Sequence, residues 1–364
     1  MKNVYKNIVS IILAASVVIG TFFLNTSMMS LAADAKQMEV HFIDVGQGDA
    51  TLITCDGHSM LIDAGDDSKG TAIQNYLQKQ KIQKLDYLIL THPDADHIGG
   101  APVIITKFEI NKVFVSNYEK DNKTYQKLIQ ALDNKRLKAT TPKVGAKYYL
   151  GTAEIIILAP NKKYDDPNNA SVCVLIKNGE NRFLFTGDAE EKAEKDILDN
   201  QLDISANVYH AGHHGSRTST SEEFFKAVKP VYAVISCGEG NFYGHPHAQT
   251  LNLFRTNGVE VFRTDEQGSI IAVSDGKEIV WNCSPSTTWI AGEPSDSSKS
   301  ESIQEKTNET PVATTYICNI NTKKFHYPSC SSVKQMSEKN KKTVTLSRDE
   351  VISQGYVPCK RCNP

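Results

Sequence analysis

The chain has 364 residues, with 40 Lys and Arg against 42 Asp and Glu, which gives a formal net charge of −2. Charged residues make up 23% and hydrophobic residues 40% of the chain, and these fractions are ordinary for soluble globular proteins. They exclude a largely disordered chain, a collagen-like repeat and a protein with many membrane spans. The near-neutral balance also argues against a uniformly basic nucleic-acid coat protein.

The first 32 residues are predicted to be a secretory signal peptide. Lys2 and Lys6 precede an uncharged apolar stretch over residues 8–24, and a small-x-small sequence predicts cleavage after residue 32. The alternative is an uncleaved membrane anchor formed by residues 8–24. Either interpretation places the rest of the chain outside the cytoplasm, so we expect a secreted or extracellular protein.

Residues 33–283 are expected to form the main domain. Short β-branched segments alternate there with segments of helical spacing, strands outnumber helices, and several strands are joined by tight turns. This pattern predicts two mixed sheets with helices outside them, in contrast to a doubly wound parallel sheet. Residues 284–314 are rich in Ser, Thr, Glu and Pro, which predicts an extended linker before a small domain at 315–364.

A dense group of possible metal ligands follows the buried strand predicted at residues 85–90. The pattern His-x-Asp-x-Asp-His places four ligands within six residues, on a turn that leaves a sheet. Imidazole nitrogens and carboxylate oxygens are ligands for divalent cations. The pattern therefore favours a metal site over a solvated acidic turn. Its ligands would be His92, Asp94, Asp96 and His97.

Further His and Asp residues end other predicted strands. Asp188 ends one strand, His213 and His214 follow another, and His245 and His247 lie in a turn containing Gly and Pro. Because separate loops would bring these side chains to one sheet edge, they predict a dinuclear hydrolytic site. Two cations in such a site activate a water molecule and hold the attacking and leaving oxygens.

Two other features have predicted roles in the reaction. Asp49 lies in a turn whose glycines, Gly46 and Gly48, are explained by backbone geometry, whereas the carboxylate is not, so we expect it to be functional. His245 or His247 is expected to donate a proton to a leaving oxygen or to grip a phosphate. The predicted catalytic residues are Asp49, Asp96, His214, His245 and His247.

Taken together, these segments resemble the metallo-β-lactamase fold. More narrowly, they resemble the extracellular hydrolase domain of the competence DNA-uptake protein ComEC and its secreted relatives. The resemblance covers residues 38–276 and implies an αββα sandwich with two divalent cations, Zn²⁺ or Mn²⁺. The matching segments, in chain order, are residues 41–50, 61–65, 91–97, 169–171, 186–190, 213–216 and 243–247.

The resemblance implies that His92, Asp94 and Asp188 hold the first cation. Asp63 would brace the metal loop without binding a cation. The chain departs from the broad family pattern twice, because Asp94 and Asn169 stand where many members have histidines. The first cation is therefore expected to bind weakly, and the oxygen-rich ligand set shifts preference toward Mn²⁺ or Mg²⁺.

The second cation would be held, by the same resemblance, by Asp96, His97 and one histidine of the pair His213 and His214. Asp188 would bridge the two cations. His214 is favoured over His213, since the ligand in this family usually directly precedes the glycine.

The small domain at residues 315–364 carries nine basic and three acidic residues, a net charge of +6. Its two ligand pairs lie about thirty residues apart, which predicts a closed tetrahedral Zn²⁺ site. Disulfides are the alternative, but they leave a histidine at ligand spacing unexplained. The segment resembles the metal-binding domain of the DNA-repair protein Ada, and Cys318 is a fifth thiol that either competes as a ligand or stays free. The expected ligands are His326, Cys330, Cys359 and Cys362.

These features predict a secreted metal-dependent hydrolase, with a phosphodiesterase or DNA nuclease favoured, in which a metal-bridging hydroxide attacks phosphorus. Alternative substrates are choline phosphate on a cell-wall polymer or a lactone, because one fold hosts many chemistries. A hypothesis of another class is a catalytically weak protein whose basic domain binds DNA or an anionic cell wall. Nucleic acid is the expected partner, and we expect no transmembrane channel in this chain.

Overall fold

The computed structural model describes residues 35–292 and, nearer the C-terminus, residues 314–328, 330–346, 351, 354, 356–359 and 362. The predicted signal peptide and most of the predicted linker lie outside the described residues. The chain divides into two compact units, Met1–Ser295 and Asp296–Pro364. Within the described residues, no helix is both long enough and apolar enough to cross a membrane.

The first unit contains two mixed β-sheets. Strands of the first sheet are β1 (Met38–Phe42), β2 (Thr51–Cys55), β3 (His58–Ile62), β4 (Lys84–Leu90), β5 (Glu109–Val115), β6 (Ala139–Thr140), β14 (Ile270–Ser274) and β15 (Ile279–Trp281). Strands of the second are β7 (Lys147–Leu150), β8 (Ala153–Ala159), β9 (Cys173–Asn178), β10 (Asn181–Phe185), β11 (Val208–His210), β12 (Tyr232–Ile235) and β13 (Glu260–Arg263). Their spatial orders are β15-β14-β1-β2-β3-β4-β5-β6 and β13-β12-β11-β10-β9-β8-β7.

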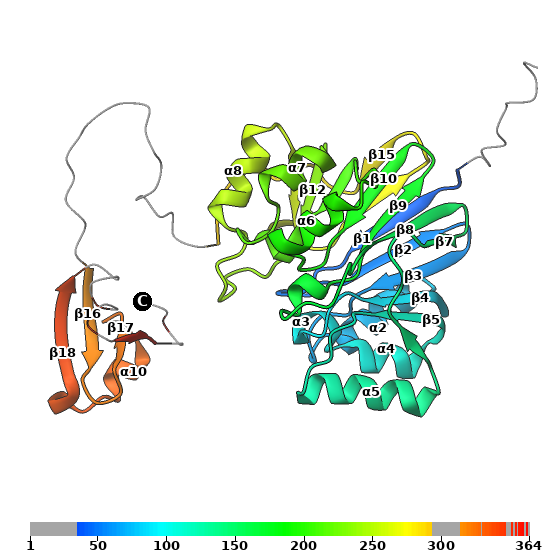
Figure 1. Ribbon diagram of the computed structural model, residues 1–364. Helices are drawn as coiled ribbons and strands as arrows, with labels where there is room; N and C mark the ends of the chain where they lie inside the picture. Colours follow the sequence, from blue (N-terminus) through cyan, green and yellow to red (C-terminus); the bar gives the residue numbers. More distant parts are fainter. Residues whose placement is uncertain are drawn as a thin grey trace, which may run out of the picture. The chain divides into compact units, whose positions relative to one another are not determined.

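Helices cover the outer faces of both sheets (Figure 1). On the first sheet lie α2 (Gly70–Lys79), α4 (Ala101–Lys107) and α5 (Lys123–Lys135), with the short α3 (Ala95–Ile98) in the loop after β4. On the second sheet lie α6 (Glu191–Asp199), α7 (Glu222–Val228) and α8 (Ala248–Thr256), while the short α9 (Thr264–Gln267) follows β13. This arrangement confirms the predicted αββα sandwich.

The apolar pattern of the sequence explains these layers. In β4, Ile89 points into the core between the sheets, whereas Leu88 and Leu90 pack under the helices of the first sheet. A strand buried on both faces needs a continuous apolar run, and residues 88–90 at the end of β4 are such a run. Helices are buried on one face only, and in α5 the buried residues Leu128 and Leu132 are four apart.

Parallel pairing brings the carboxyl ends of several strands together. In the first sheet β3 pairs in parallel with β4, and in the second sheet β10, β11 and β12 are parallel neighbours. The loops that follow these strands carry Asp63, His92, Asp188, His214 and His245. The topology therefore gathers the predicted site residues at one end of the sandwich.

Residues after Cys283, where the linker was predicted to begin, form hydrogen bonds with the rest of the first unit. The backbone amide of Ser286 donates to the carbonyl of Val261 at 2.7 Å, and Arg263 Nη1 donates to the carbonyl of Ile290 at 2.6 Å. The amide of Gly292 donates to the carbonyl of Pro246 at 2.9 Å. Backbone groups form two of these three contacts, so the polar composition of the segment gave no sign of them.

The second unit has a four-stranded sheet in the order β18-β16-β17-β19 and a short helix, α10 (Ser331–Lys334). The strands are β16 (Thr314–Asn319), β17 (Lys324–His326), β18 (Lys341–Leu346) and β19 (Val357–Pro358). The buried core of its described residues consists of Tyr316, Cys318, Phe325, Val351 and Tyr356. A core of this size needs a further stabilising device.

Candidate metal centre

The metal loop after β4 is packed against the loop that contains Asp49. The backbone amide of Asp49 donates to the carbonyl of Asp96 at 3.1 Å, and the amide of Ala64 donates to the carbonyl of His97 at 2.7 Å. A Cβ atom on Gly48 would lie 2.4 Å from the Asp96 carbonyl oxygen, and the φ of Gly48 is +129°. Only glycine permits this approach, so the glycine-flanked turn positions the metal loop.

Four buried residues converge on one point and could hold a metal ion. Their ligand atoms all lie within 4.8 Å of one another. His97 Nε2 lies 3.2 Å from Asp188 Oδ1 and 3.3 Å from His214 Nε2, and His214 Nδ1 lies 3.3 Å from Asp49 Oδ1. The four residues are Asp49, His97, Asp188 and His214. We call them the ligand cluster.

Three more predicted residues border the ligand cluster. Asp188 Oδ2 lies 3.7 Å from His92 Nε2 and 3.6 Å from His213 Nε2. Asp96 Oδ2 lies 3.4 Å from His214 Nε2. Asp188 therefore faces histidines from two different loops, as a carboxylate that bridges two cations would.

Asp94 and Asn169, the two residues that depart from the family pattern, contact other parts of the chain. Lys120 Nζ lies 2.7 Å from Asp94 Oδ1, so a cation of the chain itself holds this carboxylate. Asn169 Oδ1 accepts a hydrogen bond from the backbone amide of Ala193, in the first turn of α6, at 3.0 Å. The asparagine is thereby tied to a helix, and ligation of a cation by Asp94 remains a prediction.

The paired histidines occupy strained backbone. In the short turn η2 (Gly212–Gly215), His213 has φ +51° and His214 has φ +55°. The left-handed region costs a residue with a side chain about 1–2 kcal/mol. Strain of this kind persists where the surroundings enforce it, often at functional sites. Here it brings both imidazoles to Asp188.

The carboxylates in and around the ligand cluster determine the pKa values of its two histidines. Burial alone would lower the pKa of His97, but the carboxylates of Asp188 and Asp63 outweigh it and raise this pKa well above its usual value. The pKa of His214 is likewise raised, against burial, by Asp188 and Asp49. Burial and the neighbouring His97 instead lower the pKa of His92 to about 4. Without metal, two imidazolium groups therefore supply the positive charge that the carboxylates require.

Cation binding at pH 7 is expected to release about two protons, one each from His97 and His214, because ligand imidazoles must be neutral. Cation affinity should therefore increase with pH. The raised pKa values also stabilise the metal-free fold below pH about 6.5, and this stabilisation is lost as pH rises through the folded-state pKa values. Calorimetric titration with Mn²⁺ or Zn²⁺ in buffers of different ionisation enthalpy counts the protons, and a count of zero would contradict the assignment.

Asp63 contacts the metal loop without joining the ligand cluster. Its Oδ1 accepts a hydrogen bond from the backbone amide of Thr91 at 2.8 Å, and its Oδ2 accepts one from the Thr91 hydroxyl at 2.7 Å. The same Oδ2 lies 2.9 Å from His97 Nδ1. These contacts orient His97 so that Nε2 faces the ligand cluster, as the predicted bracing role requires.

The two predicted acid histidines differ in their surroundings. His245 is buried, its ring centroid lies 5.3 Å from that of His213, and its Nδ1 has no hydrogen-bond partner among the described residues. Burial and the nearby His214 lower its pKa to about 3, so it is neutral at pH 7 and offers hydrogen bonds in place of a positive charge. His247 Nδ1 accepts a hydrogen bond from the backbone amide of Arg217 at 3.0 Å.

Sequence reasoning gave Asp49 a role in the reaction but did not place it among the possible metal ligands, and it gave no role to His210. His210 ends β11, is buried, and lies with Nε2 2.8 Å from Ser236 Oγ and 3.7 Å from Asp49 Oδ1. Its place at a strand end, like that of His213 and His214, was the available signal. Lys120 had no signal, because its contact with the metal loop depends on tertiary structure.

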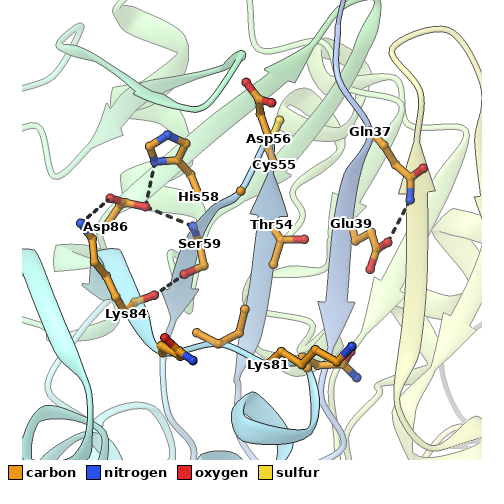
Figure 2. A pocket seen from close by; sticks show the side chains of 14 residues that line it. Gln37, Glu39, Thr54, Cys55, Asp56, His58, Ser59, Lys81, Lys84 and Asp86 are labelled. Carbon is orange, nitrogen blue, oxygen red and sulfur yellow. Dashed lines mark hydrogen bonds and ion pairs between the residues drawn. The ribbon is translucent and has the colours of Figure 1, made fainter.

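A hollow of about 620 Å³ lies away from the ligand cluster, where β3 and β4 begin. Figure 2 shows His58, Ser59, Lys84 and Asp86 on its wall. His58 Nδ1 lies 3.0 Å from Asp86 Oδ2, and the Ser59 hydroxyl donates to the carbonyl of Lys84 at 2.5 Å. None of its lining residues has a buried side-chain nitrogen or oxygen without a hydrogen bond, whereas Asp188, His92 and Asp49 each have one. The ligand cluster is therefore the better candidate site.

The second unit holds a separate group of possible ligands. Their ligand atoms also lie within 4.8 Å of one another, and Nδ1 of the histidine is buried without a hydrogen bond in the described residues. No disulfide forms among the eight cysteines, all of which the structure describes, and Cys318 is buried in the core of this unit. The group consists of His326, Cys330, Cys359 and Cys362, the predicted set.

Replacing Cys359 with Ser is expected to remove about one zinc ion per chain, because a structural site needs all four ligands. Loss of the ion should unfold the small second unit, making residues 314–362 sensitive to protease while the first unit stays resistant. Elemental analysis and limited proteolysis measure both effects, with Cys283→Ser in the first unit as control. Unchanged zinc content in Cys359→Ser would contradict the site.

Comparison with known proteins supports the same family. The model of the Metallo-beta-lactamase superfamily matches residues 43–239. ComE operon protein 3 of Bacillus subtilis (strain 168) is 31% identical over 257 residues, covering 65% of this chain and 33% of that protein. Recombination protein 2 of Haemophilus influenzae (strain ATCC 51907 / DSM 11121 / KW20 / Rd) is 34% identical over 215 residues, covering 57% and 25%. Competence protein ComA of Neisseria gonorrhoeae is 29% identical over 242 residues, covering 66% and 33%.

The chain spans a third or less of the length of each of these three relatives. The matches confirm the resemblance to competence proteins for the shared segment, and divalent cations are the ligands that this fold binds. Because the family match extends over more than half of its length, the chain belongs to the metallo-beta-lactamase superfamily of hydrolases.

Proposed function

We propose that this chain is an exported, metal-dependent phosphodiesterase that cleaves nucleic acid, with DNA as the favoured substrate. The observation that carries the proposal is the position of Asp188, whose carboxylate faces imidazoles from the metal loop and from η2 within one buried cluster. A central carboxylate between two sets of nitrogen and oxygen ligands is the arrangement expected for two cations that act on one phosphate.

The residues present fit divalent cations. Asp188 Oδ1, Asp49 Oδ1 and His92 Nε2 are buried and make no hydrogen bond of good geometry within the described residues, which is costly unless another group satisfies them. Imidazole nitrogens lie 3.2 Å from Asp188 Oδ1 and 3.3 Å from Asp49 Oδ1, and a cation between them would replace these contacts. One cation would be held by His92, Asp188 and Asp94, if Asp94 leaves Lys120. The ligands of the other would be His97, His214, Asp188, Asp96 and Asp49.

Bound cations at such a site would activate water and neutralise charge on the phosphate oxygens. The residues of the chain supply the remaining functions. His245, neutral at pH 7, would donate a hydrogen bond to the leaving oxygen, and Asp63 keeps His97 in the tautomer that presents Nε2. Lys120 is about one-third exposed beside Asp94 and would offer its ammonium group to a phosphate.

DNA is favoured over other phosphodiesters by two lines of support. Relatives in the shared segment are named as competence and recombination proteins, and both processes handle DNA. The second unit carries a net charge of +6 over residues 315–364, which suits a phosphate backbone. Export follows from the predicted signal peptide.

The test is metal-restored cleavage. The purified chain, stripped of cations, is assayed on single- and double-stranded DNA with Mn²⁺, Mg²⁺ or Zn²⁺ added back, beside an Asp96→Ala variant. Cleavage that returns with a cation and is lost in the variant would support the proposal and name the cation. If the chain hydrolyses a choline phosphate ester or a lactone but does not cleave DNA, its substrate belongs to one of those classes. If no substrate is hydrolysed with any cation, the alternative hypothesis of a binding protein is favoured.

A further inference from the structure

The loop over residues 238–247 presents two aromatic rings to solvent. Phe242 is 83% exposed and Tyr243 is 62% exposed. Phe242 has the highest exposure of any large hydrophobic residue that the structure describes. Neighbouring large apolar side chains exposed together mark an interaction site more often than chance.

The loop holds both rings in the solvent. Asn241 fixes its backbone by hydrogen bonds to residues that precede and follow the two rings. Its Oδ1 accepts hydrogen bonds from the amides of Tyr243, at 3.1 Å, and His245, at 3.0 Å. Its Nδ2 donates to the carbonyls of Gly238, at 2.9 Å, and His245, at 2.6 Å. A loop with four side-chain-to-backbone bonds from one residue presents its tip in a defined position.

The ring of Tyr243, which follows Phe242 in the chain, is linked to the candidate metal centre through His245 and His213. The ring of Tyr243 stacks on that of His245 with centroids 5.6 Å apart and an interplanar angle of 17°. His245 in turn lies edge-on to His213, with centroids 5.3 Å apart, and His213 contacts Asp188. A group stacked on Tyr243 would therefore lie next to whatever the ligand cluster acts on.

The chemistry of the loop favours a flat, uncharged group over a phosphate. The tip of the loop, residues 238–243, contains Glu239 and neither Lys, Arg nor His, so it offers stacking surface without attraction for an anion. Aromatic side chains beside a phosphate-binding centre bind single-stranded nucleic acid by stacking on its bases, whatever the sequence.

We propose that Phe242 and Tyr243 form a platform on which an unpaired base next to the scissile phosphate stacks. This inference rests on the proposed nuclease function and specifies its substrate as single-stranded nucleic acid, or the frayed end of a duplex. A paired base is already stacked within its helix and offers no free face to the platform.

The test compares an unpaired oligonucleotide with the same oligonucleotide lacking the bases around the cleaved bond. Phe242→Ala and Tyr243→Ala are each expected to raise KM for the complete oligonucleotide about tenfold, the effect of losing one base–aromatic stack, with little change in kcat. Neither variant should change KM for the abasic oligonucleotide. Tyr243→Phe should retain the wild-type KM. Tyr149→Ala, which removes a tyrosine with 60% exposure on β7, is the matched control.

Different results would overturn the platform alone or the platform together with the proposed function. If the wild-type chain cleaves DNA and the Phe242 and Tyr243 variants keep its KM, the platform is overturned while the proposed function stands. Equal losses on complete and abasic oligonucleotides would show that the rings support the site and do not bind a base, which also overturns it. If the wild-type chain cleaves no nucleic acid with any cation, the proposed function and this inference fail together.

Discussion

Replacing Asp188 with Asn is expected to lower the rate of hydrolysis about 1,000-fold and to remove at least one bound cation. The amide keeps the shape of the carboxylate but loses the charge that faces His92, His97, His213 and His214. Cations that clamp a reacting phosphate supply several kcal/mol of transition-state stabilisation, and each 1.36 kcal/mol corresponds to a tenfold change in rate. Elemental analysis and steady-state rates on the preferred substrate measure the two effects.

Asp199→Asn is the matched control, since Asp199 is an exposed aspartate at the end of α6. It should retain full cation content and full rate. The circular dichroism spectrum of Asp188→Asn should match that of the wild type, which separates loss of cations from loss of fold. If Asp188→Asn kept its cations and a tenth of the wild-type rate, the bridging role would belong to another carboxylate.

The fold could be predicted from the sequence because each layer buries residues at a regular spacing, and the apolar residues of the sequence follow that spacing. The unbroken run Leu88-Ile89-Leu90 identified a strand buried on both faces, and the spaced leucines of α5 identified a helix buried on one. Residues 284–292 could not be placed from composition. Backbone hydrogen bonds carry much of their attachment, and a backbone amide such as that of Gly292 leaves no trace in the sequence.

The site could be predicted only in part, for a related reason. The histidines and aspartates of the metal loop stand close together in the chain, so their density alone indicated a metal site. Asp49, in contrast, approaches His214 from a distant segment, and its loop fits only because Gly48 lets the Asp96 carbonyl come close. The contacts of Asp94 with Lys120 and of Asn169 with α6 likewise depend on tertiary structure.

Replacing Asp63 with Asn is expected to weaken cation binding about 10- to 100-fold, although Asp63 is not a predicted ligand. Asp63 Oδ2 lies 2.9 Å from His97 Nδ1 and can accept a hydrogen bond from its N–H. If an amide nitrogen takes this place, His97 faces a second donor, and relief requires its proton to move to Nε2. Protonated there, the imidazole cannot bind a cation through the atom that faces Asp188.

Two measurements identify this mechanism. Calorimetric titration gives the cation affinity. Nitrogen NMR of the metal-free chain, recorded at a pH above the raised pKa of His97 so that its ring is neutral, shows which nitrogen of His97 carries the remaining proton. The control is Asp56→Asn, the same exchange at an exposed turn residue whose φ of +50° is close to the +57° of Asp63. If Asp63→Asn bound cations as tightly as Asp56→Asn, the tautomer of His97 would not depend on Asp63. Weak binding with the proton still on Nδ1 would instead mean that Asp63 acts by holding the metal loop through Thr91.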